Sequence, residues 1–285
     1  MSLLLRAALC GLLLAVACGR EEQAKAPSSA PERPASTPYD EARRLLERGQ
    51  ADAALAALQS APAGAESYYL QGAAWAKKAE TAPLPTPPPA PSPLPRGYIP
   101  PSAPEFKEAE LQALSLLERA VADEANHARA HQAIADLLAP HAVRRAEMSK
   151  AAPARSRGKR DKPEAPPPVA PTEGPEASAD RVIREYRLAM TADPAGKAPV
   201  EALIVFCDRT DRAVEAEAAF EELLKREREK PEPYVRYGDF LKARHNFEGA
   251  IGQYRQALMW KADDEDTKAK IGEIYIAMAQ EHLGR

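Results

Sequence analysis

The sequence predicts an all-α protein built of helical hairpins, and two observations carry this prediction. Within residues 231–264, apolar and small side chains follow two helical faces: Tyr234, Tyr237, Gly238 and Leu241 on the first, and Ala250, Tyr254, Ala257 and Leu258 on the second. The polar segment between them, residues 244–248, is too short for anything but a tight turn, so the helices must fold back antiparallel. Related patterns recur at a fixed interval along the chain, which indicates a stack of repeats.

In residue order and in its length of about 34 residues, this segment resembles a tetratricopeptide repeat (TPR). The resemblance implies a right-handed superhelical solenoid in which the first helix of each hairpin lines the concave wall. Gly238 and Ala250 are the small residues that let the two helices approach, so we expect neither to tolerate a bulky side chain.

The repeat pattern extends over most of the chain. The remaining pairs are expected at 39–48 with 51–60, 65–78 with 105–122, 128–139 with 180–194, and within 197–230, followed by a single C-terminal capping helix in 265–285. Two of these pairs are interrupted by insertions, at 81–104 and 140–177. The predicted organisation is therefore a signal peptide (1–17), a disordered tether (18–38) and a TPR solenoid (39–285) with two disordered insertions.

The two insertions differ in chemistry. Nearly half of segment 81–104 is proline, which is typical of a polyproline-II arm or of an inert linker. Segment 140–177 begins with a possible helical extension at 141–150. Between His141 and Pro163 it carries eight Lys or Arg against two acids, which indicates an anion-attracting loop or simply a solvated one.

The N-terminus has the features of an export signal. One basic residue, Arg6, precedes a short apolar core that ends in small residues. Residues 14–19, LAVACG, resemble a bacterial lipobox, although Ala15 stands where the family prefers Leu; the resemblance implies that Cys18 is acylated and becomes the new N-terminus. The alternative is an ordinary cleaved signal with an incidental cysteine. Acylation would place the protein in the cell envelope, facing the periplasm, with the outer membrane favoured over the inner.

Catalytic motifs are absent from the sequence. It has no GxxxxGK[ST], GxGxxG after a strand, HExxH, CxxC or GxSxG. His127 and His131 have the spacing of a metal pair, but His131 takes a large packing position of the repeat and His127 falls in the preceding turn. Cys207 fits a small buried hydrophobe better than a nucleophile. We therefore expect no enzymatic activity, no cofactor and no metal. The net charge of −3 does not call for a nucleic-acid partner.

Function is then expected on the concave wall, where the resemblance places the outward residues of the first helices. The candidate partner-binding residues are Asp136, Glu201, Val205, Asp208, Glu232, Val235, Asp239, Lys242, Glu273 and Ile276. Together with Arg129, Arg209 and Asp266 this wall carries an acidic excess beside apolar patches. We expect either a protein or peptide partner with basic and apolar residues, or an acidic surface that maintains solubility.

The sequence thus predicts a TPR lipoprotein of a Gram-negative-type bacterium that acts as an adaptor or assembly factor of an envelope machine. The alternative is an accessory subunit that recruits a cell-envelope enzyme, such as a peptidoglycan-modifying one.

We predict that cells fed a fatty-acid analogue incorporate it into this protein at Cys18. The apolar core and the small residues before this cysteine are the features on which acylation depends, and two or three chains anchor stably where one is marginal. The measurement is in-gel detection of the label. Label retained after Cys18→Ser, or absent from the unaltered protein, would contradict acylation.

Overall fold

A computed structural model describes residues 37–83, 106–151 and 177–283. These residues form eleven α-helices and no strand. The helices are α1 (Pro38–Glu47), α2 (Ala51–Leu58), α3 (Ala65–Thr81), α4 (Glu108–Asp123), α5 (Ala128–Ala151), α6 (Ala179–Ala192), α7 (Ala198–Arg209), α8 (Ala213–Arg226), α9 (Pro231–Ala243), α10 (Phe247–Trp260) and α11 (Glu265–Leu283). The signal, residues 18–36 of the tether and most of both insertions lie outside the described residues. The last two tether residues belong to the folded part instead, because Thr37 caps α1 and Pro38 begins it.

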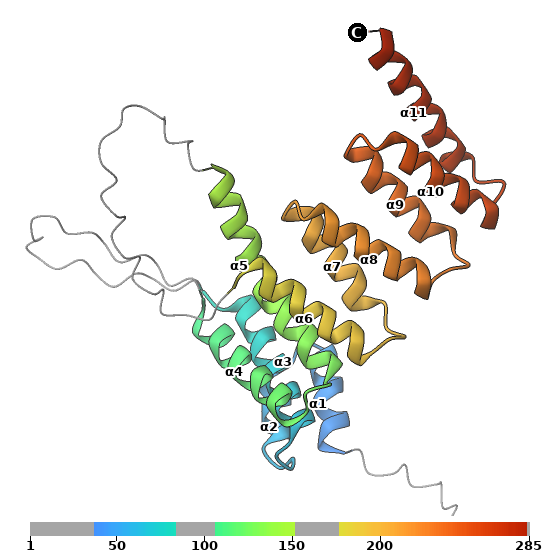
Figure 1. Cartoon of the computed structure of the whole chain (residues 1–285). Coiled ribbons are helices and arrows are strands. Elements are labelled where there is room, and N and C mark those ends of the chain that lie inside the picture. The colour runs from blue at the N-terminus through green and yellow to red at the C-terminus, as the bar shows by residue number, and fades with distance from the viewer. Residues whose placement is uncertain (1–36, 84–105, 152–176, 284–285) are drawn as a thin grey trace, which may run out of the picture. The chain divides into compact units, whose positions relative to one another are not determined.

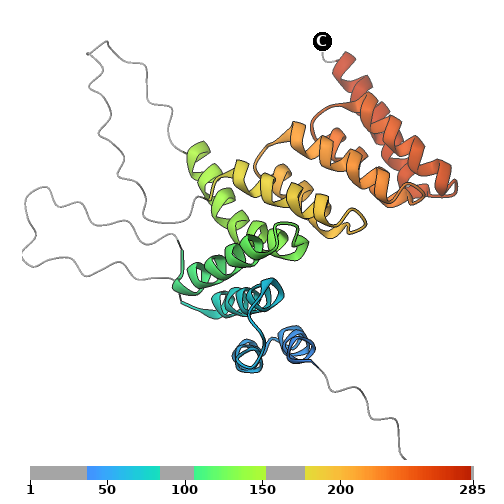
Figure 2. The same ribbon diagram turned by 60° about the horizontal axis from the view of Figure 1, so that its bottom comes forward.

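The helices pack as consecutive hairpins (Figures 1 and 2). The odd-numbered helices from α1 to α9 are the first helices of the hairpins and the even-numbered ones are the second; α11 packs on α10 as a further first helix. Second helices α6, α8 and α10 begin at Ala179, Ala213 and Phe247, so their starts are separated by two equal intervals of one repeat. The predicted all-α fold of helix-turn-helix repeats is therefore confirmed.

The three short hairpin turns, after α1, α7 and α9, use the same backbone conformation. Asp211 and His245, which occupy the same position of successive repeats, have φ values of 59° and 58°, and Gly49 in the first turn has 74°. A residue in this left-handed region ends a helix and reverses the chain. Asn246 then caps α10, because its side-chain oxygen accepts a hydrogen bond from the Gly249 N–H at 3.1 Å.

One first helix is longer than the repeat pattern predicts. The pattern ends this helix at Ala139, but α5 continues through Pro140 to Ala151 and includes the possible extension as part of the same helix. Proline removes one backbone hydrogen bond and usually kinks or ends a helix. Here tertiary packing offsets that cost, since Ala142 and Val143 are buried and the His141 ring lies 4.1 Å from that of Phe106.

The apolar core follows the hairpins. One buried cluster joins α1, α2 and α3, and a second runs from Phe106, just before α4, to Ile274 in α11. Cys207 belongs to the second cluster, and burial raises the pKa of its thiol to about 12. A thiol with this pKa stays protonated at neutral pH. This agrees with the prediction that Cys207 is a small buried hydrophobe rather than a nucleophile.

Close approach within a hairpin depends on glycine at two positions. A Cβ added at Gly238 would lie 2.5 Å from a ring carbon of Tyr254, and one added at Gly72 would lie 2.7 Å from Leu117. Both large side chains are completely buried, so neither has room to move aside.

In the described part of the chain, no helix has the length and apolar composition needed to cross a membrane.

We predict that Gly238→Ala lowers the free energy of unfolding by about 1 to 3 kcal/mol, the usual cost of overpacking a core. Gly252→Ala is the matched control, because Gly252 is also inside a helix but has nothing within 4 Å of its added Cβ. The control should gain up to about 1 kcal/mol from higher helix propensity. Urea unfolding followed by circular dichroism measures both; equal effects at the two glycines would show that the Tyr254 contact is unimportant.

Candidate functional site

The predicted binding residues lie on the outward surface of the first helices α5, α7, α9 and α11. This first-helix surface is held together by ion pairs that join each first helix to the next. From the N-terminal end, the pairs are Arg43–Glu66 at 2.7 Å, Glu66–Arg129 at 3.5 Å, Glu147–Arg209 at 3.9 Å, Glu201–Arg236 at 3.1 Å and Lys242–Glu273 at 2.6 Å. We call this series the ion-pair ladder.

Two further pairs strengthen the C-terminal part of the ladder. Asp239 in α9 pairs with Lys270 in α11 at 2.6 Å, and Asp208 in α7 pairs with Arg244 after α9 at 3.1 Å. Four of the predicted acids, Glu201, Asp208, Asp239 and Glu273, are therefore already paired within the protein. Each exposed pair contributes only about 0 to 1 kcal/mol, but it neutralises a charge that a partner would otherwise meet.

The bases Arg236 and Lys270 were not among the predicted binding residues. Arg236 lies 35 positions after Glu201, which is one residue more than a repeat. Lys270 lies 31 positions after Asp239, which is nearly one helical turn less than a repeat. Side chains on neighbouring parallel helices meet across such offsets rather than at identical repeat positions. A search for opposite charges about one repeat apart, with a tolerance of one helical turn, is the signal that would have found them.

Two predicted acids are held from behind by tyrosines of the second helices. Tyr186 in α6 donates its hydroxyl to Asp136 at 2.7 Å, and Tyr254 in α10 donates to Asp239 at 2.7 Å. Burial is the largest cause that raises the pKa of both phenols, so each hydroxyl keeps its proton and acts as the donor. Each bond joins the two helices of one hairpin.

Two other hairpins indicate that the hydroxyl and the acid belong together. At the position of Tyr254, α8 has Phe220 and α4 has Leu117, neither of which can donate a hydrogen bond. At the position of Asp239, the paired helices have Val205 and Ala73. In these four hairpins, the first helix has an acid at this position only where a buried tyrosine of the second helix donates a hydrogen bond to it. Asp136 and Asp239 therefore connect the two helices of their hairpins and also contribute to the first-helix surface.

A pocket of about 760 Å³ lies between α9, α11 and the turn that follows α10. Its lining includes the predicted wall residues Glu232, Val235, Asp266 and Glu273. The lining residues that were not predicted are Pro231, Arg236, Lys261, Asp264, Thr267, Ala269 and Lys270. Asp136, Glu201, Val205, Asp208, Asp239, Lys242 and Ile276 do not line it. Val205 and Ile276 are nevertheless well exposed, at 54% and 60%.

Charge is distributed unevenly in this pocket. Each of its bases is paired with a carboxylate, and Glu273 and Asp264 have basic partners. Within the described residues, Glu232 and Asp266 make no ion pair and are exposed. The pocket therefore offers two carboxylates that form no close ion pair, beside an apolar lining from Val235 and Ala269.

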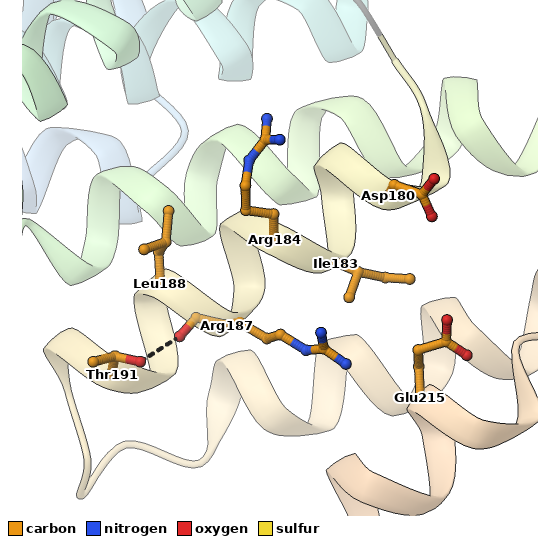
Figure 3. Close-up of a pocket in the computed structure, with 7 residues that line it drawn as sticks. All are labelled: Asp180, Ile183, Arg184, Arg187, Leu188, Thr191 and Glu215. Atoms are coloured by element: carbon orange, nitrogen blue, oxygen red, sulfur yellow. Dashed lines mark hydrogen bonds between the residues drawn. The ribbon is translucent and has the colours of Figure 1, made fainter.

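A second hollow, of about 280 Å³, lies on the outer face of α6 and near Glu215 of α8 (Figure 3). Arg184 and Arg187 both line it, but Arg184 points away from Arg187, which is directed toward the Glu215 side (Figure 3). Two guanidinium groups that diverge cannot close on one anion. This hollow therefore gathers no set of groups for a common ligand.

His127 and His131 form separate contacts rather than a metal pair. The His127 Nδ1 accepts from the Ala130 N–H at 3.1 Å, and its Nε2 faces Glu66 at 3.3 Å. His131 is buried; its Nδ1 faces Glu185 at 2.7 Å and its Nε2 faces the Ala125 carbonyl at 2.9 Å.

Both acceptors around His131 favour its doubly protonated form. The bond to Glu185 is the largest cause that raises its pKa, against the opposing effect of burial. Among the described residues, no group of three or more His, Cys, Asp or Glu has an arrangement that could hold a metal ion.

Comparisons with known proteins give a likeness of fold only. No family model matches the chain, and no curated protein matches it in sequence. A TPR protein of Thermus thermophilus is 16% identical over 84% of this chain and 97% of its own, with a TM-score of 0.41. MamA from Desulfovibrio magneticus is 11% identical in sequence, with a TM-score of 0.44. The match covers 78% of this chain and 92% of the MamA chain. A TPR protein of Parabacteroides merdae is 10% identical in sequence, with a TM-score of 0.45. The match covers 86% of this chain and 75% of that protein.

We predict that the contact between His131 and Glu185 makes stability depend on pH. The folded-state pKa of His131 is raised above 6.5, so its stabilisation is complete below pH 6.5 and is lost as pH rises through the folded-state value. The free energy of unfolding of the unaltered protein should exceed that of His131→Gln most at low pH, and the difference should shrink as pH rises. In a Glu185→Gln background this pH dependence should become smaller, because only the Ala125 carbonyl then favours the protonated form; an undiminished dependence would show that Glu185 does not cause it.

Proposed function

We propose that this chain is a non-enzymatic scaffold that binds another protein on its first-helix surface, at the pocket between α9 and α11. The observation that supports this most is the pair of carboxylates, Glu232 and Asp266, which line one pocket without an ion-pair partner among the described residues. Charged groups left uncompensated beside apolar side chains are suited to an exposed, reversible contact with a polypeptide.

The chemistry of the pocket selects the partner. A Lys or Arg side chain satisfies the two carboxylates, and a neighbouring apolar side chain contacts Val235 and Ala269. We therefore propose a partner segment with a basic residue next to an apolar one. The charges mainly raise the association rate, while burial of the apolar side chain prolongs the complex. An acidic partner would meet repulsion from the same two carboxylates.

The cellular role that we propose rests on Cys18. If this residue is acylated, the scaffold is tethered to the cell envelope and faces the periplasm, where it acts as an adaptor or assembly factor. The alternative proposal is an accessory subunit that recruits an envelope enzyme. Capture from detergent-solubilised membranes separates them, because the first role predicts components of an envelope assembly and the second predicts a wall-modifying enzyme.

We predict that the double variant Glu232→Lys, Asp266→Lys binds labelled peptides containing Lys-Leu or Arg-Leu about tenfold or more weakly than the unaltered protein, a loss of about 1.4 kcal/mol. The matched control is Glu221→Lys, Glu248→Lys, which makes the same change in net charge on exposed positions of the second helices α8 and α10. Fluorescence anisotropy at physiological salt measures the affinities.

Three outcomes bear on this proposal. Loss of binding in the pocket variant alone supports it. Equal loss in both double variants would show that only the overall charge matters. Binding that survives both, or no binding of basic peptides by the unaltered protein, would place recognition elsewhere on the chain.

A further inference from the structure

One face of α6 carries the side chains that the pocket between α9 and α11 selects. Four exposed residues stand at positions i, i+3, i+4 and i+7 of this helix, so they share one face, and all of them line the hollow on its outer side (Figure 3): Arg184, Arg187, Leu188 and Thr191. Leu188 is 40% exposed and directly follows Arg187 in the sequence. We call these four residues the α6 stripe.

The two arginines of the α6 stripe have no acidic partner in the described part of the chain. The acids that line the same hollow are Asp180 and Glu215, and both are held by Arg212, at 3.0 Å and 3.4 Å. Neither Arg184 nor Arg187 forms an ion pair with a described residue. The stripe therefore presents two arginines that form no close ion pair, next to an exposed leucine.

The residues of the stripe are particular to α6. At the positions of Arg184, Arg187 and Leu188, α8 has Ala, Glu and Glu (218, 221 and 222) and α10 has Gly, Arg and Gln (252, 255 and 256). These second helices form the same hairpins with quite different side chains on this face. Packing of the repeat thus does not require the arginines and the leucine of α6.

The pocket between α9 and α11 has groups that match the stripe. Its carboxylates without a close ion pair, Glu232 and Asp266, stand at the same position of two successive repeats and so belong to different helices. Arg184 points away from Arg187 (Figure 3), so the two guanidinium groups do not compete for one carboxylate. The other bases of the pocket are already paired with acids of the same copy.

We propose that this pocket binds the α6 stripe of a second copy of the chain. The inference rests on the proposed function and names the partner at that same pocket. Arg184 and Arg187 meet the two carboxylates, and Leu188 lies against Val235 of the other copy. The stripe and the pocket of one copy cannot meet, because both belong to one row of packed helices in which α7 and α8 lie between them (Figure 1).

This contact joins two different surfaces, so it leaves one stripe and one pocket free in every pair of copies. Such a heterologous interface builds rings where its rotation closes and open chains where it does not. The contact depends on exposed charges and a single leucine, so association should be reversible and should weaken as salt is added.

The first test is sedimentation velocity of the full chain over a range of concentrations, in a non-ionic detergent because the first residues are strongly apolar. The pocket variant is Glu232→Gln, Asp266→Asn and the stripe variant is Arg184→Ala, Arg187→Gln. Each should need about tenfold or more protein to reach the association of the unaltered chain.

The matched control is Glu221→Gln, Glu248→Gln, which removes the same charge as the pocket variant from exposed positions of α8 and α10 and should associate normally. An unaltered protein that stays monomeric at every concentration, or equal weakening in the control, overturns the proposal. Circular dichroism shows whether each variant is folded.

The second test mixes the two variants in equal amounts. The pocket variant keeps its stripe and the stripe variant keeps its pocket, so one intact contact forms between them and no further copy can add to it. The mixture should therefore form a complex of two copies that does not grow with concentration. A mixture that stays monomeric, or that forms the larger assemblies of the unaltered chain, contradicts the pairing of stripe with pocket.

Peptide binding separates this inference from the proposed function. The stripe variant keeps the pocket, so it should bind a labelled Arg-Leu peptide at least as tightly as the unaltered protein, and excess peptide should dissociate the assemblies of the unaltered chain. Peptide binding without self-association would overturn the inference and leave the proposed function in place. Self-association in the absence of peptide binding would count against the proposed function, and self-association that the pocket variant does not weaken would overturn the inference alone.

Discussion

The contact between Tyr254 and the backbone of α9 at Gly238 is the constraint on which the α9–α10 hairpin depends. Because no side chain stands at Gly238, the ring packs directly against the first helix and sets the distance between the two helices. The same ring sends its hydroxyl to Asp239, so one residue determines both the separation of the helices and the position of a surface carboxylate. The core and the first-helix surface are thus coupled through single side chains rather than built independently.

Much of this fold could be predicted because the determining residues recur locally. Gly238, Ala250 and Tyr254 belong to a single hairpin, and helical periodicity alone brings them together. The end of α5 could not be predicted in the same way. Proline terminates helices by a local rule, whereas α5 passes Pro140 because buried Val143 and the contact of His141 with Phe106 stabilise the next turns. Phe106 precedes the whole of α4 in the sequence, and no periodic pattern connects it to His141.

The sequence predicted the acidic residues of the candidate site but not that basic residues of the neighbouring helices pair with them. Repeat positions identified Glu201, Asp239 and Glu273 correctly as residues of the first helices. Their basic partners lie on the neighbouring helix, up to nearly one helical turn out of the repeat register, and this offset follows from how adjacent helices face each other in space. A count by repeat position therefore overestimates the acidic excess. The structure reduces the uncompensated carboxylates of the pocket to Glu232 and Asp266.

In a row of hairpins, the side chains that hold neighbouring helices together are the same ones that a partner protein would contact. A first helix between two neighbours uses its apolar face within its hairpin and its outward charges in the ion-pair ladder, as α9 does with Gly238 and Arg236. Helix α11 packs on α10, and Asp266 at its start has no ion-pair partner among the described residues. Groups available to a partner are therefore concentrated at this helix.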